Sequence, residues 1–308
     1  MVRSAAVLAV AAPLAACGGS GSPVAQEPAT GTSGAADSAT SSLPAFLTST
    51  APVSTTDSAS SSGGQAVVVL APAQPVSDAV LNQIVALLRV RTARMAGGSD
   101  TITSANGQIT VTGTADQAAQ LKALAGQGTL LFRPVLGVKT PLPTPSGAAE
   151  KKAEDAFGAL DCTWSDPTKP LAAPADYLAA CAQSSGAGVG IQKYLMGPAA
   201  LSGKDVSKVQ TSQSNGAWEV DITLDDAGAS AMAALTATAA SGQDSDGTNR
   251  FAVVLDDVVY EAPTVTSTIS DGQLQLSVTN QTFANQDAAV WSVGAMPLRL
   301  VSSSVSGG

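Results

Sequence analysis

The sequence predicts an α+β fold, in which a ferredoxin-like βαβ base segment is followed by a mixed or antiparallel sheet with helices on one face. From Gln65 onward, short apolar runs with strand-like patterns alternate with runs of helical spacing. Ala217–Leu224 alternates apolar and polar residues strictly, and Asn249–Pro263 predicts a hairpin. No Gly-rich phosphate loop follows a strand, which argues against a Rossmann fold.

The first 17 residues form a targeting signal. Arg3 supplies a positive charge, and Ala5–Leu14 is apolar but too short to span a bilayer. The following Leu14-Ala15-Ala16-Cys17-Gly18 resembles the lipobox of bacterial lipoproteins, which implies that Cys17 becomes acylated. The alternative is an ordinary signal peptide with a chance cysteine. No later stretch has ~18 uninterrupted apolar residues, so we expect no other membrane span.

Residues 18–64 predict a disordered tether. The segment consists mainly of Ser, Thr, Ala, Gly and Pro, and it has little apolar surface to offset the entropy cost of ordering. A flexible coil of this length would span on the order of 35–40 Å on average. We therefore expect the folded part to stand clear of the membrane to which Cys17 is attached.

A first folded segment is expected over 65–138. Ala66–Leu70 predicts a strand, and Ser77 is the expected N-cap of an amphipathic helix over Asp78–Met95. Three arginines lie near the end of that helix, where cations suit the helix dipole, and we interpret them as a solvated helix end. They are Arg89, Arg91 and Arg94.

The same segment continues as β-α-β. Gln108–Thr112 predicts a strand, and Thr114–Gln117 fits a capping box at the start of a helix that ends at Gly126. Thr129–Leu136 predicts a further strand. The order β-α-β-α-β is the ferredoxin-like pattern.

Residues 139–190 form a linker and a cysteine-containing insert, with a helix expected over Glu150–Leu160. After acylation of Cys17, Cys162 and Cys181 are the remaining thiols, and we favour a disulfide between them. The bridge would contribute about 3 kcal/mol by restricting the unfolded chain. A metal pair would lack further ligands, and a redox pair would favour closer spacing.

A second folded segment is expected over 191–302, before a flexible tail at 303–308. In Ala217–Leu224, Glu219 and Asp221 lie side by side, and we interpret them as the wet face of a strand rather than as a catalytic pair. A helix follows, capped by Asp225 or Asp226 and continuing through Ala239. A strand over Gly272–Thr279 and a short helix opened by Thr282-Phe283 complete the segment.

The hairpin within Asn249–Pro263 turns at Asp256–Asp257, and we expect it at the centre of a sheet. Asp tolerates positive φ less well than Gly, so the turn should be strained or of another type. The two carboxylates could in principle bind calcium, but an oxygen cage needs about 6–8 ligands, and no loop here supplies them.

Composition excludes several classes of function. The chain has 308 residues, a formal net charge of -9 and no histidine. The charge argues against nucleic-acid binding, which needs clustered Lys and Arg. The absence of histidine excludes a Ser-His-Asp triad, a Cys-His pair and a His-based zinc site. We predict no enzyme activity, no cofactor and no metal.

Several of these motifs resemble the large extracytoplasmic domain of the SecD/SecDF family of protein-export subunits. The matching motifs are Phe132-Arg133-Pro134, Lys204-Asp205-Val206, the Asn249–Pro263 hairpin and Gly294-Ala295-Met296-Pro297. Family members tend to carry Gly where this chain has Asp257. The resemblance assigns 65–138 to a SecD-like base segment and 191–302 to a SecD-like head subdomain.

The resemblance implies a non-catalytic binding module that assists export or handles translocated polypeptides. We expect it on the extracytoplasmic face of the bacterial plasma membrane, lipid-anchored through Cys17. Its partners would be unfolded or translocating polypeptide and subunits of the translocase, contacted through apolar clefts and exposed sheet edges. The alternative is a structural or adhesion lipoprotein of the cell envelope that reuses the fold.

Overall fold

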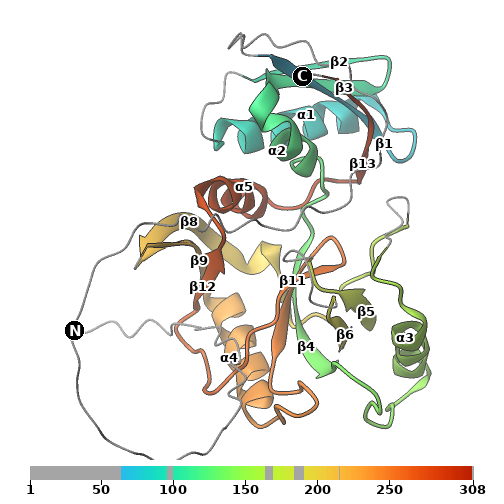
Figure 1. Cartoon of the computed structure of the whole chain (residues 1–308), viewed down its shortest axis with the longest axis vertical. Coiled ribbons are helices and arrows are strands. Elements are labelled where there is room, and N and C mark those ends of the chain that lie inside the picture. The colour runs from blue at the N-terminus through green and yellow to red at the C-terminus, as the bar shows by residue number, and fades with distance from the viewer. Residues whose placement is uncertain (1–63, 96–99, 164–168, 184–190, 215, 307–308) are drawn as a thin grey trace, which may run out of the picture. The chain divides into compact units, whose positions relative to one another are not determined.

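Three antiparallel sheets organise the described part of the chain (Figure 1). The computed structural model describes residues 64–95, 100–163, 169–183, 191–214 and 216–306, with side chains as far as residue 302. The expected signal segment 1–17 and residues 18–63 of the expected tether lie outside the described residues. The chain divides into two units, and all described residues belong to the unit that includes Gly63–Gly308.

The first sheet has the ferredoxin-like arrangement, with strand order β13-β1-β3-β2 and antiparallel neighbours throughout. Its elements follow one another as β-α-β-β-α-β, the split βαβ pattern. They are β1 (Gln65–Pro72), α1 (Asp78–Ala93), β2 (Thr101–Ala105), β3 (Gln108–Thr114), the 3₁₀ turn η1 (Ala115–Gln117), α2 (Ala118–Ala123) and β13 (Leu300–Ser306). The expected Ser77 N-cap and Thr114–Gln117 capping box are both present.

Two expectations about this sheet are corrected. The strand expected over Thr129–Leu136 is β4 (Leu130–Gly137), and it joins the second sheet by pairing with β10 and β6. The fourth strand of the first sheet is instead β13, which includes residues expected in a flexible tail at 303–308. Val305 pairs with Val68, so the chain returns to its first strand as far as Ser306. A Ser-rich strand such as β13 carries little apolar pattern by which sequence could reveal it.

The second sheet has strand order β11-β10-β4-β6-β5, and β7 also pairs with β4. Its strands are β5 (Leu178–Cys181), β6 (Lys193–Met196), β7 (Leu201–Ser202), β10 (Phe251–Leu255) and β11 (Val258–Glu261). Helix α3 (Ala148–Ala159) packs against β5 and β6. The β10–β11 hairpin follows β4 in this order, and β10 lies between β4 and β11.

The second sheet closes on itself. Ala182, directly after β5, forms a parallel bridge with Val259 of β11, and the amide of Gln183 donates to the Val259 carbonyl oxygen at 2.7 Å. A small apolar core contains residues of all five strands in the order above, including Leu131, Val254 and Val259, which are almost fully buried. The sequence therefore folds this region as a small barrel rather than an open sheet.

The third sheet has strand order β12-β9-β8, from β8 (Val206–Ser214), β9 (Ala217–Leu224) and β12 (Gln273–Val278). The 3₁₀ turn η2 (Gly203–Asp205) leads into β8. Helix α5 (Gln281–Trp291) packs on all three strands, and α4 (Asp226–Ala240) packs on β9 and on β4, β7 and β10 (Figure 1). The predicted alternation is confirmed, since Val220 and Ile222 are fully buried. Asp225 is the N-cap of α4.

Candidate functional site

The two carboxylates of β9, Glu219 and Asp221, differ in their surroundings. Asp221 accepts a hydrogen bond from Nε2 of Gln275 at 3.0 Å. Glu219 is only 8% exposed, and burial, followed by the neighbouring Asp221, raises the pKa of its carboxyl. Glu219 therefore lies buried within the polar face of the sheet, which corrects the expected wet position. Within the described ranges, no group of three or more His, Cys, Asp or Glu residues is placed to hold a metal ion.

The carboxylates of the hairpin turn accept hydrogen bonds from backbone amides of other chain segments. Asp256 and Asp257 have φ values of 51° and 64°, so both central residues are left-handed, as in a type I′ turn. Asp256 accepts from the amides of Gly128 at 3.1 Å and Thr129 at 2.8 Å. Asp257 accepts from the amide of Ala172 at 2.8 Å. The turn thereby joins β10 and β11 to two distant segments of the chain.

Arg91 is not a solvated helix end, which corrects the sequence interpretation. Its side chain is fully buried and donates to the carbonyl oxygens of Leu124, Gly126, Gln127 and Gly294 at 2.7–3.0 Å. Burial lowers its pKa to about 10, and the charge of Asp256 opposes that effect. Arg94 and Arg89 are exposed, as expected. The charge pattern of the helix could not separate Arg91 from its neighbours.

Arg133, in the Phe-Arg-Pro motif, is a second buried cation with a structural role. It donates to the carbonyl oxygens of Asp176, Gly197 and Ala173. Burial lowers the pKa of its guanidinium, while Asp257 and Asp176 oppose the shift. The motif therefore fixes the chain segments that flank β5 and β6 against β4.

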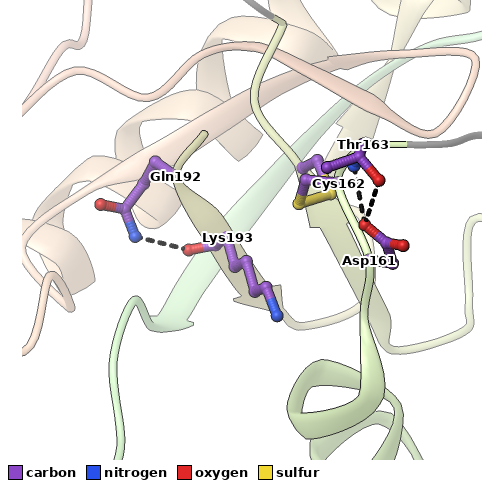
Figure 2. The surroundings of a disulfide bond; sticks show 6 residues. Asp161, Cys162, Thr163, Gln192 and Lys193 are labelled. Atoms are coloured by element: carbon purple, nitrogen blue, oxygen red, sulfur yellow. Dashed lines mark hydrogen bonds between the residues drawn. A yellow bond between two sulfur atoms is a disulfide. The ribbon is translucent and has the colours of Figure 1, made fainter. Parts of the chain in front are cut away.

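A disulfide joins Cys162 to Cys181, with a Cα–Cα distance of 5.7 Å (Figure 2). It attaches the segment after α3 to the last residue of β5. Beside it, the Asp161 carboxylate accepts from the amide of Thr163 at 2.8 Å and from its hydroxyl at 2.7 Å. These two bonds hold the pKa of Asp161 below its usual value. Cys17, the expected lipidation site, lies outside the described residues.

Sequence reasoning missed two acids with raised pKa values, Asp287 of α5 and Glu261 of β11. The Tyr260 hydroxyl donates to the Asp287 carboxylate, and the Tyr260 ring meets Trp291 edge-on, with centroids 5.1 Å apart. Burial raises the pKa of Asp287 to about 6, although the bond from Tyr260 opposes the shift. Burial also raises the pKa of Glu261 to about 7. Among the described groups, the Glu261 Oε2 atom has no hydrogen-bond partner. Asp287 follows Ala284 by three positions on the buried side of α5, which is the signal that could have revealed it.

The described surface offers sheet edges and shallow hollows. Two of the hollows, of about 150 and 160 Å³, are lined mostly by polar residues. Among the large apolar side chains that the structure describes, Val90, Val258 and Phe283 are exposed, each on a different element. The third sheet ends in β8, a nine-residue strand at its edge. Among the outer strands of the first and third sheets, β8 is the longest.

Part of this chain matches a known protein family. The family model for the SecDF P1 head subdomain matches residues 182–298. In the structure this stretch starts at the bridge after β5 and ends just before β13, so it includes β6, β7, β10 and β11 of the barrel and the strands of the third sheet. It excludes β1 to β5 and β13.

One curated relative is the protein translocase subunit SecD of Streptomyces coelicolor (strain ATCC BAA-471 / A3(2) / M145). The two are 32% identical over 165 residues, covering 51% of this chain and 28% of SecD. The chain therefore matches less than a third of the length of that relative.

Two solved SecDF structures are also similar. A crystal structure of SecDF in the super-membrane-facing form matches 80% of this chain and 30% of its own, with 21% identity and a TM-score of 0.49. A structure of SecDF, described as a membrane component that enhances protein export, matches 77% of this chain and 98% of its own, with 20% identity and a TM-score of 0.46.

The described residues define an α+β domain with a ferredoxin-like sheet, a small barrel and a three-stranded sheet covered on one face. Within this domain, residues 182–298 match the SecDF P1 head subdomain, and the chain is similar to SecD over 165 residues. Across the part of the chain that the structure describes, no helix has the length and apolar character required to cross a bilayer.

Proposed function

We propose that this chain is a non-catalytic binding module of bacterial protein export, which holds unfolded segments of translocated polypeptide outside the plasma membrane. The observation that carries the proposal is the SecDF P1 head match over 182–298. The Cys162–Cys181 disulfide supports an extracytoplasmic location, because disulfides persist in oxidising compartments. The sheet edges that no other described strand covers support polypeptide binding, because an extended chain can pair with them.

The module would work close to the membrane. Acyl chains on Cys17 would hold it on the outer leaflet, and a tether over 18–64 would let it reach emerging chains and subunits of the translocase. The variant Cys17→Ala tests the anchor: we expect the wild-type protein in the membrane fraction and the variant in the soluble fraction. An unmodified Cys17 in the mass spectrum of the mature wild-type protein would refute lipid anchoring.

The binding function is tested with a purified protein and a chemically denatured client. Light scattering should show that the protein suppresses aggregation of the client in a stoichiometric manner and without ATP. Serum albumin at the same mass concentration controls for crowding. If the client aggregates at the same rate with and without the protein, the proposal fails. Recovery of cell-wall components alone in a membrane pull-down would instead favour the adhesion alternative.

A further inference from the structure

We infer that the outer edge of β8 is the surface on which this domain holds its partner, an extended polypeptide segment that adds to the β12-β9-β8 sheet as a fourth strand. The inference rests on the proposed function and names the surface for it. Three observations support it. Alternate backbone groups of β8 point away from the sheet, most of the strand lacks the residues that prevent edge pairing, and two cations lie at its beginning.

The register shows which backbone groups of β8 are free. The amide of Leu224 in β9 donates to the carbonyl oxygen of Gly272, on the side of β12. Alternate residues of a middle strand bond to opposite neighbours, so even-numbered residues of β9 bond to β12 and odd-numbered ones to β8. The odd-numbered residues pair with even-numbered residues of β8, as in Gln210↔Asp221. The backbone groups of Val209, Thr211 and Gln213 therefore point away from the sheet.

These outward groups have no partner strand among the described residues: no backbone hydrogen bond from another segment reaches Val209, Thr211 or Gln213. Proteins usually guard such edges with Pro, charged side chains or bulges. At the beginning of β8, a bulge at Val206/Lys208 and the charge of Lys208 disfavour pairing with another strand. From Val209 to Ser214 the strand has no Pro, Gly or charged residue. Its row of outward N–H and C=O groups matches an extended backbone.

The opposite edge of the same sheet is less suited to this role. By the same alternation, the outward backbone groups of β12 belong to Gln273, Gln275 and Ser277. The amide of Gln273 already donates to the carboxylate of Asp271 at 3.1 Å. β12 also has six residues against nine in β8. The β12 edge therefore serves as an internal control.

The beginning of the β8 edge favours a negative charge on the partner. The hollow of about 150 Å³ lies beside Val206–Val209, and Arg94 from the end of α1 and Ser292 from the end of α5 complete its lining. The Ser292 hydroxyl is buried and has no partner among the described groups. Arg94 and Lys208 supply two cations without an acidic residue in the lining. The segment that fits is an extended polypeptide with an acidic residue at this end.

Binding of synthetic peptides to the full chain tests the inference by fluorescence anisotropy. The probe is an eight-residue peptide of alternating Val and Thr with a terminal Glu. Two copies of it differ only in a terminal Lys or in N-methyl groups on alternate amides. We expect the Glu peptide to bind better than the Lys peptide, Arg94→Ala to remove that preference, and N-methylation to abolish binding by blocking the ladder.

Thr211→Pro removes one outward amide without breaking a bond to β9, because proline is tolerated on the free side of an edge strand. We expect it to weaken binding of the Glu peptide by at least about tenfold. Ser277→Pro, the equivalent change on the β12 edge, should leave binding within about twofold. Thermal unfolding verifies that both variants are folded, and Gln213→Pro, at an exposed position, replaces Thr211→Pro if that variant unfolds.

Three outcomes would overturn the inference. The first is a folded Thr211→Pro variant that binds the Glu peptide as the wild type does. The second is an N-methylated peptide that binds equally well. The third is a wild-type dimer in sedimentation that Thr211→Pro dissociates without an effect on peptide binding, because a second copy would then occupy the edge. In each case the wild type still suppresses client aggregation if the proposed function holds, so the two failures are distinguishable.

Discussion

The Nη2 atom of Arg91 donates to the carbonyl oxygen of Gly294 at 2.9 Å, although the two residues are 203 positions apart in the chain. The other acceptors of Arg91 are carbonyl oxygens of the loop between α2 and β4. One side chain therefore joins α1, the loop that leads into the barrel, and the turn that follows α5. Gly128 lies against this guanidinium, and a Cβ atom there would come within 2.3 Å of Nη2.

We predict that Arg91→Met lowers the free energy of unfolding by about 3–5 kcal/mol, because four carbonyl oxygens around the buried guanidinium lose their donor. Urea denaturation at neutral pH measures the change. Arg94→Ala, in the same helix but exposed, is the control and should cost less than about 0.5 kcal/mol. A loss below about 1 kcal/mol in Arg91→Met would mean that water replaces the missing donor.

The acidic turn gives a prediction that depends on two opposing effects. Asp257→Gly would relieve the cost of a left-handed residue but would remove the acceptor of the Ala172 amide. A hydrogen bond to a charged group contributes about 1.5–3 kcal/mol, more than the conformational gain of up to about 1 kcal/mol. Asp257→Gly should therefore destabilise the protein by about 0.5–2 kcal/mol.

Asp257→Asn is the matched variant, because asparagine tolerates the left-handed region and keeps an oxygen that can accept from Ala172. We expect its free energy of unfolding to fall by about 1 kcal/mol in urea denaturation, because a neutral oxygen accepts a weaker hydrogen bond than a carboxylate. If the glycine variant is the more stable of the two, the conformational cost outweighs the hydrogen bond.

Sequence reasoning predicted the elements that carry a local signal. The strict alternation of β9 indicated its buried face, and the capping residues Ser77, Thr114 and Asp225 marked helix starts, because each pattern depends only on near neighbours. The family motifs indicated the head subdomain that the comparison identifies at 182–298.

Features that depend on distant partners could not be predicted in this way. β13 is a strand because β1 offers a free edge, and its own residues have little apolar alternation. In sequence, Arg91 resembles Arg89 and Arg94. It differs from them because the α2–β4 loop and Gly294 lie against its side chain and accept its hydrogen bonds. The β8 edge is likewise defined by the absence of a neighbouring strand among the described residues, which no local pattern reveals.

The disulfide should stabilise the barrel by restricting the unfolded chain. Cys162 and Cys181 are 19 positions apart, so the closed loop contributes about 3 kcal/mol in the chain-entropy model. We predict that the double variant Cys162→Ser/Cys181→Ser loses about 2–4 kcal/mol in urea denaturation. A reductant should destabilise the wild type similarly and leave the double variant unchanged. An effect of the reductant on the double variant would place its action at another site.

The buried Glu261 carboxyl predicts that stability falls as pH rises. Burial raises its pKa from 4.5 to about 7 in the folded protein. Between these values the folded state binds more protons than the unfolded state, so the free energy of unfolding decreases with increasing pH. The contribution is fully present below about pH 4.5 and is lost as pH passes about 7. Its upper bound is about 3 kcal/mol, and the partial exposure of Glu261 lowers the expected value to about 1–2 kcal/mol.

Urea denaturation at intervals from pH 4.5 to 8, followed by tryptophan fluorescence, measures this dependence. Glu261→Gln should flatten the decrease, because a neutral side chain has no proton to lose. Asp287→Asn should remove a further part at lower pH, between 3.8 and about 6, since burial raises the pKa of Asp287 from 3.8 to about 6. Asp78→Asn, at an exposed position, should leave the slope unchanged. A Glu261→Gln profile parallel to that of the wild type would show that the Glu261 carboxyl titrates near its usual pKa, with water reaching Oε2 in the folded protein.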